Sequence, residues 1–212
     1  MRIKLNNIRY KKLLLILISI LSLGSKSSNA LAEYEIDEIV NLYKFLHSNP
    51  ELSWQEDRTA KYLSDILELE GYEVTRGVGE KGVVAILKNG KGPTLMIRAD
   101  MDALPIEEKT NLEYASKVRQ INRFGEEVPV MHACGHDIHM SVLIGTAKNL
   151  ISLKNKWSGT LMLILQPAEE VGQGSLAMLK DGLFERFPRP DFNLALHVSG
   201  MGPAGTIGYQ LG

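Results

Sequence analysis

The amino-acid sequence predicts an α/β protein built on a central mixed, mostly parallel sheet that is flanked by helices. Short runs that are almost wholly apolar, as in strands buried on both faces, alternate with longer segments of helical spacing. Polar residues able to do chemistry follow several of these runs, where ligands bind in open α/β sheets. The 212 residues are 44% hydrophobic, which is enough for one substantial domain and too apolar for a disordered chain.

The expected elements follow one another with short connections. Helices are expected over residues 36–46, 57–70, 137–153 and 175–179, and Gly71 is a candidate for the glycine that follows a helix end. Strands are expected over residues 83–87, 94–99, 160–165 and 192–198, with residues 74–87 forming a hairpin-like excursion. The Gly-rich residues 201–212 are typical of a linker.

The charge is unevenly distributed along the chain. The formal net charge of −1 excludes a strongly basic nucleic-acid binder, so no nucleic-acid partner is expected. Residues 1–32 hold six basic and no acidic residues. Because the whole chain has 24 basic and 25 acidic residues, the remainder carries 18 basic and 25 acidic ones. The two parts are therefore treated separately.

Residues 1–32 are typical of a secretory signal peptide. A basic stretch leads into the apolar run 13–23, and small and polar residues follow, with cleavage expected after Ala32 or after Ala30. The apolar run is shorter than the roughly 20 residues that span a bilayer, so no stable membrane span is expected after cleavage. The sequence therefore predicts an exported protein, periplasmic or secreted.

Polar residues gather after the strands. Four segments would bring Asp, Glu, His and the single cysteine to one edge of the sheet, with these residues: Asp100 and Asp102; Cys134 and His136; Glu169 and Glu170; and His197. Taken one at a time, each has a structural explanation, such as a buried cysteine, a capping aspartate, a solvated glutamate pair or a core histidine. His132 and His139 are neighbours that could orient ligands or simply pack.

The combination favours a metal site. Thiolate, imidazole and carboxylate form the ligand set of a borderline-soft divalent metal, most typically zinc. Cys134-Gly-His136 can present two side chains to one ion from a glycine-permitted turn. One glutamate of the pair can ligate while the other takes a proton, and Asp100 can orient a ligand or the base. Metal-activated water with a carboxylate base is suited to amide hydrolysis.

Two other interpretations fail. A cysteine nucleophile with His136 as its base leaves the glutamate pair unexplained. The glycines of residues 77–82 fit a dinucleotide-binding pattern, but an apolar strand follows them where that pattern requires a helix, so a turn is expected there.

Several motifs taken together resemble the M20 family of metallopeptidases, in the aminoacylase-like branch with hippurate hydrolases, N-acyl amino acid amidohydrolases and auxin-conjugate hydrolases. The matching segments are HSNPELS (47–53), RADMDALP (98–105), MHACGHD (131–137), QPAEE (166–170) and LHV (196–198). The resemblance spans residues 36–210 and implies a zinc-peptidase-like catalytic domain. It also implies hydrolysis of the amide bond of N-acyl amino acids or related small amides or peptides.

The resemblance also implies roles for individual residues. Cys134 would bridge two divalent metal ions, zinc or manganese with cobalt or nickel as alternatives, and His136, Glu170 and His197 would be further ligands. Glu169 would be the general base that activates the water and later protonates the leaving amine. Asp100 would be the supporting carboxylate behind the site.

The extent of the resemblance sets the expected domains. Residues 1–32 would be the signal peptide, residues 33–200 the N-terminal part of the catalytic domain, and residues 201–212 a linker toward a lid and dimerisation domain. The family's last histidine ligand and its homodimer contacts would lie beyond Gly212. The alternatives are an inactive remnant or metal-binding fragment without catalysis, and a signal-anchored interaction module with a vestigial site. Missing strands would leave a sheet edge and an apolar face exposed.

Overall fold

The structure, a computed structural model, describes residues 32–208. The expected signal peptide, apart from its last residue, and the end of the expected linker therefore lie outside the described residues. The chain divides into two compact units, Met1–Glu38 and Ile39–Gly212. Of the first unit only the start of helix α2 (Ala32–Ser48) is described, and all that follows concerns the second unit.

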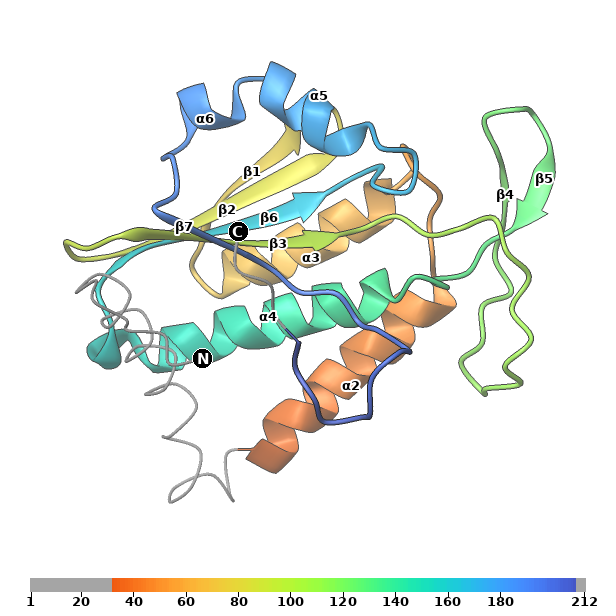
Figure 1. The fold of residues 1–212 in the computed structure, drawn as a ribbon, viewed down its shortest axis with the longest axis horizontal. Helices are drawn as coiled ribbons and strands as arrows, with labels where there is room; N and C mark the ends of the chain where they lie inside the picture. Colours follow the sequence, from red (N-terminus) through yellow and green to blue (C-terminus); the bar gives the residue numbers. More distant parts are fainter. Residues whose placement is uncertain (1–31, 209–212) are drawn as a thin grey trace, which may run out of the picture. The chain divides into compact units, whose positions relative to one another are not determined.

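A five-stranded sheet forms the centre of the second unit (Figure 1). Its order is β1-β2-β6-β3-β7, with the bounds β1 (Glu73–Val78), β2 (Gly82–Asn89), β6 (Gly159–Gln166), β3 (Thr94–Asp100) and β7 (Phe192–Ala195). Strand β2 is antiparallel to both of its neighbours, whereas β6, β3 and β7 pair in parallel. Only β2 therefore runs against the other four, and the predicted mixed sheet is confirmed.

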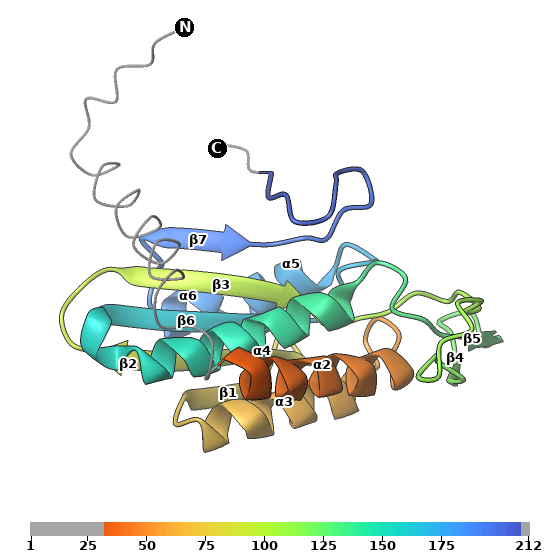
Figure 2. The same cartoon turned by 90° about the horizontal axis from the view of Figure 1, so that it is seen from below.

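Helices cover both faces of this sheet (Figures 1 and 2). Helices α3 (Asp57–Leu69) and α4 (His136–Ser152) lie on one side together with α2, and α5 (Gly174–Lys180) and α6 (Leu183–Arg186) lie on the other. The strand residues alternate between the two cores, as the two-residue period of a strand requires.

That alternation appears in adjacent residues of β6. Leu163 packs in the core with α2, α3 and α4, and Ile164 packs in the core with α5 and α6. Both side chains are nearly inaccessible to solvent. Burial of such a side chain contributes about 1.5–3 kcal/mol to the free energy of folding. Because alternate residues of β6 point to opposite faces, the strand stabilises the packing of helices on both faces of the sheet.

Most of the expected elements are confirmed, with small changes of boundary. The segment 77–82 forms the turn between β1 and β2, as predicted, and Gly71 follows α3 with φ +88°. The expected strand 192–198 ends earlier, at Ala195. Sequence patterns missed the short elements, namely the hairpin of β4 (Arg119–Ile121) and β5 (Glu127–Pro129), the 3₁₀ helix Lys154–Lys156, and α6. Elements of three or four residues are too short to show a period.

Strand β7 is an open edge of the sheet among the described residues. It pairs only with β3, and all four of its residues are exposed. Leu194 is 43% exposed and Leu196, just beyond the strand, is 59% exposed. Apolar side chains are therefore exposed at and just beyond this edge. Over the described part of the chain, none of the helices is both long enough and apolar enough to cross a bilayer.

Candidate metal centre

The expected segments meet at the carboxyl ends of the parallel strands. Asp100 ends β3, the Glu169–Glu170 pair follows β6, His197 follows β7, and His136 begins α4. Potential ligand atoms of Cys134, His136 and His197 all lie within 4.8 Å of one another, and the same holds for Asp100, His136 and Glu169. The two groups share His136 and together contain five of the six predicted site residues. The sixth, Glu170, belongs to neither group. Glu170 Oε1 lies 3.8 Å from His136 Nε2.

His136 is the centre of the cluster and is fully buried. Its Nδ1 lies 2.7 Å from the main-chain oxygen of Asp102, and because a carbonyl can only accept, Nδ1 is the donor. In its neutral form, the ring therefore presents the lone pair of Nε2 to the site. That atom has no hydrogen-bond partner in the structure, and Glu169 Oε2 lies 3.7 Å from it.

A glycine makes the turn before His136 possible. Gly135 occupies the N-cap of α4 with φ +85°, a left-handed conformation that residues with a Cβ rarely adopt. A Cβ at this position would also lie 2.5 Å from Cγ2 of Val198. The Cys134-Gly-His136 sequence therefore lets the segment after β7, which holds His197, approach the start of α4.

Cys134 and His197 form the exposed side of the cluster. The Sγ of Cys134 lies 3.3 Å from Nε2 of His197. Burial, together with the charges of Glu170, Glu169 and Asp100, raises the pKa of the Cys134 thiol to about 11. A divalent cation in the cluster would reverse this balance, because it favours the thiolate over the thiol.

The two glutamates differ in their surroundings. The side chain of Glu169 is 39% exposed and that of Glu170 is 17% exposed. The backbone N–H of Glu170 donates to Oδ2 of Asp102 at 3.0 Å, so this residue is tied to the loop after β3. Burial raises the pKa of the Glu170 carboxyl more than its neighbours Cys134 and His136 lower it.

Asp102 was expected at this edge of the sheet, but its sequence position indicated no role. It is fully buried, its Oδ2 also accepts a hydrogen bond from Ser53 Oγ at 2.6 Å, and its Oδ1 lies 3.6 Å from His136 Nδ1. Burial alone would raise its pKa, but the neighbouring His136 ring and the hydrogen bonds from Ser53 and the Glu170 backbone outweigh burial and lower the pKa. The two-residue spacing from Asp100 was the available signal, since alternate residues of an extended segment share a face.

Asp100 lies on the other side of His136. Its Oδ1 is 3.0 Å from Nη1 of Arg98, and burial raises the pKa of its carboxyl to about 6 despite that cation. It groups with His136 and Glu169, whereas Asp102 contacts the ring nitrogen of His136. The supporting role expected for Asp100 stays a prediction.

The donor set fits a divalent cation. Three buried polar atoms in the cluster lack a hydrogen-bond partner among the described residues: His136 Nε2, Glu170 Oε1 and Asp102 Oδ1. Leaving such atoms unpaired costs about 1–3 kcal/mol each, and more for charged groups. Sulfur, imidazole nitrogen and carboxylate oxygen together are the donors that suit zinc and similar ions.

His132 and His139 border the cluster. His139 Nε2 accepts a hydrogen bond from the backbone N–H of Val198 at 2.9 Å, and its ring centroid lies 4.4 Å from that of His197. Burial lowers the pKa of His139 to about 4 and that of His132 to about 3, so both rings are neutral at pH 7. His139 thus helps to hold the segment with His197, and orienting a ligand was one of the two possibilities that the sequence left open for it.

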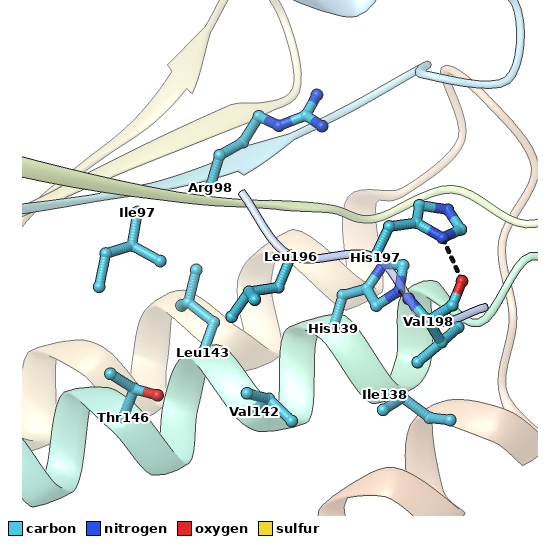
Figure 3. A pocket seen from close by; sticks show the side chains of 10 residues that line it. All are labelled: Ile97, Arg98, Ile138, His139, Val142, Leu143, Thr146, Leu196, His197 and Val198. Atoms are coloured by element: carbon cyan, nitrogen blue, oxygen red, sulfur yellow. Dashed lines mark hydrogen bonds between the residues drawn. The ribbon is translucent and has the colours of Figure 1, made fainter. Parts of the chain in front are cut away.

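A pocket of about 130 Å³ opens beside His139 and His197 (Figure 3). Its wall is mainly apolar and includes Ile97, Leu143, Val142 and Leu196, with His139 and His197 at one end. The pocket lies between α4 and the segment after β7.

Comparisons with known proteins agree with this geometry. The model of the family described as "Peptidase family M20/M25/M40" matches residues 96–212. Thermostable carboxypeptidase 1 of Saccharolobus solfataricus is 39% identical over 196 residues, which cover 91% of this chain and 47% of that protein. Hippurate hydrolase of Campylobacter jejuni is 47% identical over 143 residues, covering 67% of this chain and 34% of that protein.

A solved structure shows the same fold. The crystal structure of the Bacillus subtilis YXEP protein, a dinuclear metal binding peptidase from the M20 family, aligns with a TM-score of 0.75 at 38% identity. The alignment covers 85% of this chain and 48% of that one. The chain thus spans about half the length of the relatives it matches. Since the family model matches more than half of the 212 residues, the chain belongs to peptidase family M20/M25/M40.

Proposed function

We propose that residues 33–200 are the N-terminal part of the catalytic domain of a metal-dependent amidohydrolase that cleaves N-acyl amino acids or small peptides. The observation that carries this proposal is the convergence of a thiol, imidazoles and carboxylates around the unpartnered Nε2 of buried His136. The similarity to a hippurate hydrolase and a carboxypeptidase supports the substrate class.

Cys134, His136, Glu170 and His197 would hold two divalent ions, with Cys134 shared between them. The thiol and imidazole donors suit zinc, the carboxylates also suit manganese, and cobalt and nickel are alternatives. The similarity to a dinuclear metal binding peptidase supports the number of ions. When bound, such ions polarise an amide carbonyl and lower the pKa of a water molecule.

Glu169 would act as the general base. Its side chain is the more exposed of the pair and lies 3.7 Å from His136 Nε2, so it borders both solvent and the site. It would take a proton from the attacking water and deliver that proton to the nitrogen of the leaving amine. Glu170 is more buried and its backbone is tied to Asp102, which suits a ligand whose position must not change.

Metal content and hydrolysis, measured on the purified chain, test this proposal. We expect close to two ions per chain after dialysis against zinc or manganese, and release of amine from N-acyl amino acids. The Cys134→Ser variant should bind less metal. Bound ions without hydrolysis would favour a metal-binding fragment instead, and failure of the wild-type chain to retain any ion would overturn the metal centre.

We also propose export of the protein, with residues 1–32 removed as a signal peptide. The support is the basic, apolar and small-residue order of that segment. N-terminal sequencing of the protein from fractionated cells should give Leu31 or Glu33 as the first residue. An N-terminus at Met1 in the membrane fraction would favour a signal-anchored module.

A further inference from the structure

Glu56 is a fully buried carboxyl group that belongs to none of the ligand segments. It occupies the N-cap position of α3, yet its side chain makes no capping hydrogen bond to that helix. Its Oε1 instead accepts a hydrogen bond from the backbone N–H of Ala168 at 2.8 Å, across 112 residues of sequence. Its Oε2 has no hydrogen-bond partner among the described residues. The buried charge therefore serves something other than its own helix.

Ala168 lies in the turn that immediately precedes Glu169 and Glu170. It is fully buried and has φ +47°, the left-handed conformation that an alanine rarely adopts. Its carbonyl oxygen accepts hydrogen bonds from the N–H groups of Gln173 at 3.2 Å and Gly174 at 3.1 Å. A Cβ on Gly174 would lie 1.6 Å from the oxygen of Pro167, so the turn is too tight for any other residue there. Strained backbone of this kind persists only where its surroundings hold it.

The segment between α2 and α3 that includes Glu56 also contacts the loop after β3. Ser53 Oγ donates to Asp102 Oδ2 at 2.6 Å, and the N–H of Ala103 donates to the main-chain oxygen of Glu51 at 2.8 Å. One segment, residues 51–56, therefore touches both of the loops whose carboxylates face His136. Its own residues supply none of the proposed ligands.

We infer that Glu56 is a positioning residue, whose carboxyl oxygen holds the Ala168 N–H and thereby directs Glu169 and Glu170 toward His136. The inference rests on the proposed function, since it concerns how that site is held. Burial raises the pKa of the Glu56 carboxyl to about 7, because this position disfavours the charged form even with the hydrogen bond from Ala168. Glu51 is the residue that stabilises the start of α3, since its carboxylate accepts hydrogen bonds from the N–H groups of Arg58 and Thr59. Glu56 is therefore not needed to cap this helix.

Three variants distinguish the effect of a hydrogen-bond acceptor at the right distance from the effect of a buried charge. Glu56→Gln keeps an oxygen at the same reach and removes the charge. Glu56→Asp keeps the charge and withdraws the oxygen by one methylene group. Glu56→Met removes both. Glu51→Met is the matched control, since it removes a buried carboxylate of the same segment that does not touch the turn.

Cobalt binding is the readout, because Co²⁺ reports ligand geometry through its visible absorption bands. We expect Glu56→Asp and Glu56→Met to weaken Co²⁺ binding at least tenfold and to change the visible spectrum, as is common when a residue behind a ligand is altered. Glu56→Gln should rescue both the affinity and the spectrum. Glu51→Met should lower the melting temperature while the folded protein keeps the wild-type cobalt spectrum.

Two results would overturn the inference. One is wild-type affinity and spectrum in Glu56→Asp, the variant that keeps a carboxyl group, and this result counts even if Glu56→Met fails to fold. The other is loss of cobalt binding in Glu56→Gln to the same degree as in Glu56→Asp. Failure of the wild-type chain to bind Co²⁺ would overturn both the proposed function and this inference. If the wild-type chain binds Co²⁺ and the Glu56 variants bind it with the same affinity and spectrum, only this inference is overturned.

Discussion

The Nδ1 atom of His136 donates to the main-chain oxygen of Asp102 at 2.7 Å, while the Asp102 carboxylate accepts from the backbone N–H of Glu170 at 3.0 Å. One residue thus orients an imidazole and a glutamate that belong to different loops. Residues that orient ligands in this way commonly matter nearly as much for metal affinity as the ligands themselves.

The Asp102→Asn variant tests this relationship. The main-chain hydrogen bond to His136 would remain, but the carboxylate charge 3.6 Å from His136 Nδ1 would be lost, and an amide oxygen is a weaker acceptor than a carboxylate oxygen for the bonds from Ser53 and the Glu170 N–H. We expect zinc affinity to fall by about 10- to 100-fold, measured by competition with a chromophoric chelator. Asp65→Asn is the control, because Asp65 forms only exposed ion pairs with Lys61 and Arg76. Equal affinity in the two variants would contradict the role of Asp102.

Glu169 and Glu170 should respond differently to the same substitution. Glu169→Gln removes the proposed base, so we expect turnover of N-acyl amino acids to fall by about 100-fold or more with the metal content largely retained. Glu170→Gln removes a proposed ligand, so we expect metal content itself to fall. Turnover and metal content are measured on the same protein samples. Activity that survives in Glu169→Gln would mean that the base has been wrongly assigned.

The order of the large elements and the ligand segments could be predicted from the sequence because both depend on local patterns. The apolar runs that became β2, β3 and β6 are buried on both faces, and parallel strands bring the residues at their carboxyl ends together. Cys134 and His136 share one glycine-containing turn, so their proximity was already present in three consecutive residues.

The sequence placed Asp102 at the sheet edge without indicating its role, and it did not single out Glu56, for a physical reason. The roles of both residues come from hydrogen bonds to backbone groups 68 and 112 residues away, and a backbone N–H leaves no mark in an amino-acid sequence. The short hairpin of β4 and β5 was missed because three residues cannot establish an alternation. Sequence patterns therefore could not predict long-range contacts to the backbone or elements of only three residues.

The open edge at β7 should promote self-association. An exposed strand edge with apolar side chains offers unpaired N–H and C=O groups to another chain. We expect sedimentation velocity to show species larger than the monomer that increase with concentration, and Leu194→Lys to reduce that fraction severalfold. Leu69→Lys is the control, because Leu69 is 88% exposed at the end of α3 and lies on no sheet edge. An equal effect of the two lysines would show that general solubility, not the edge, is responsible.

His47 links three parts of the second unit through a buried network. Its Nδ1 lies 2.6 Å from Asp137 Oδ2, at the start of α4, and its Nε2 lies 2.9 Å from Glu108 Oε1. Burial alone would lower the pKa of His47, but the hydrogen bonds and charges of the two carboxylates outweigh burial and raise the pKa. The pKa of Glu108 is lowered, because its hydrogen bonds outweigh its own burial, whereas burial keeps the pKa of Asp137 raised.

This network makes the free energy of unfolding depend on pH. The folded state binds the His47 proton more tightly than the unfolded chain, in which the pKa of histidine is about 6.5. Its contribution is therefore complete below about pH 6.5 and is lost as the pH rises through the raised pKa of folded His47. At pH 6 we expect His47→Gln to lower the free energy of unfolding by about 3–5 kcal/mol, since two buried carboxylates would lose their cation.

Urea unfolding at pH 6 and at pH 9, with a chelator present at both, measures the change. The difference between wild type and His47→Gln should narrow at pH 9, because wild-type His47 has then lost its proton while the glutamine has none to lose. Lys61→Gln serves as the control, since Lys61 and its partner Asp65 are both exposed, so this substitution should change the free energy of unfolding little at either pH. A difference that stays constant between pH 6 and pH 9 would show that His47 is neutral in the folded protein and acts only through its hydrogen bonds.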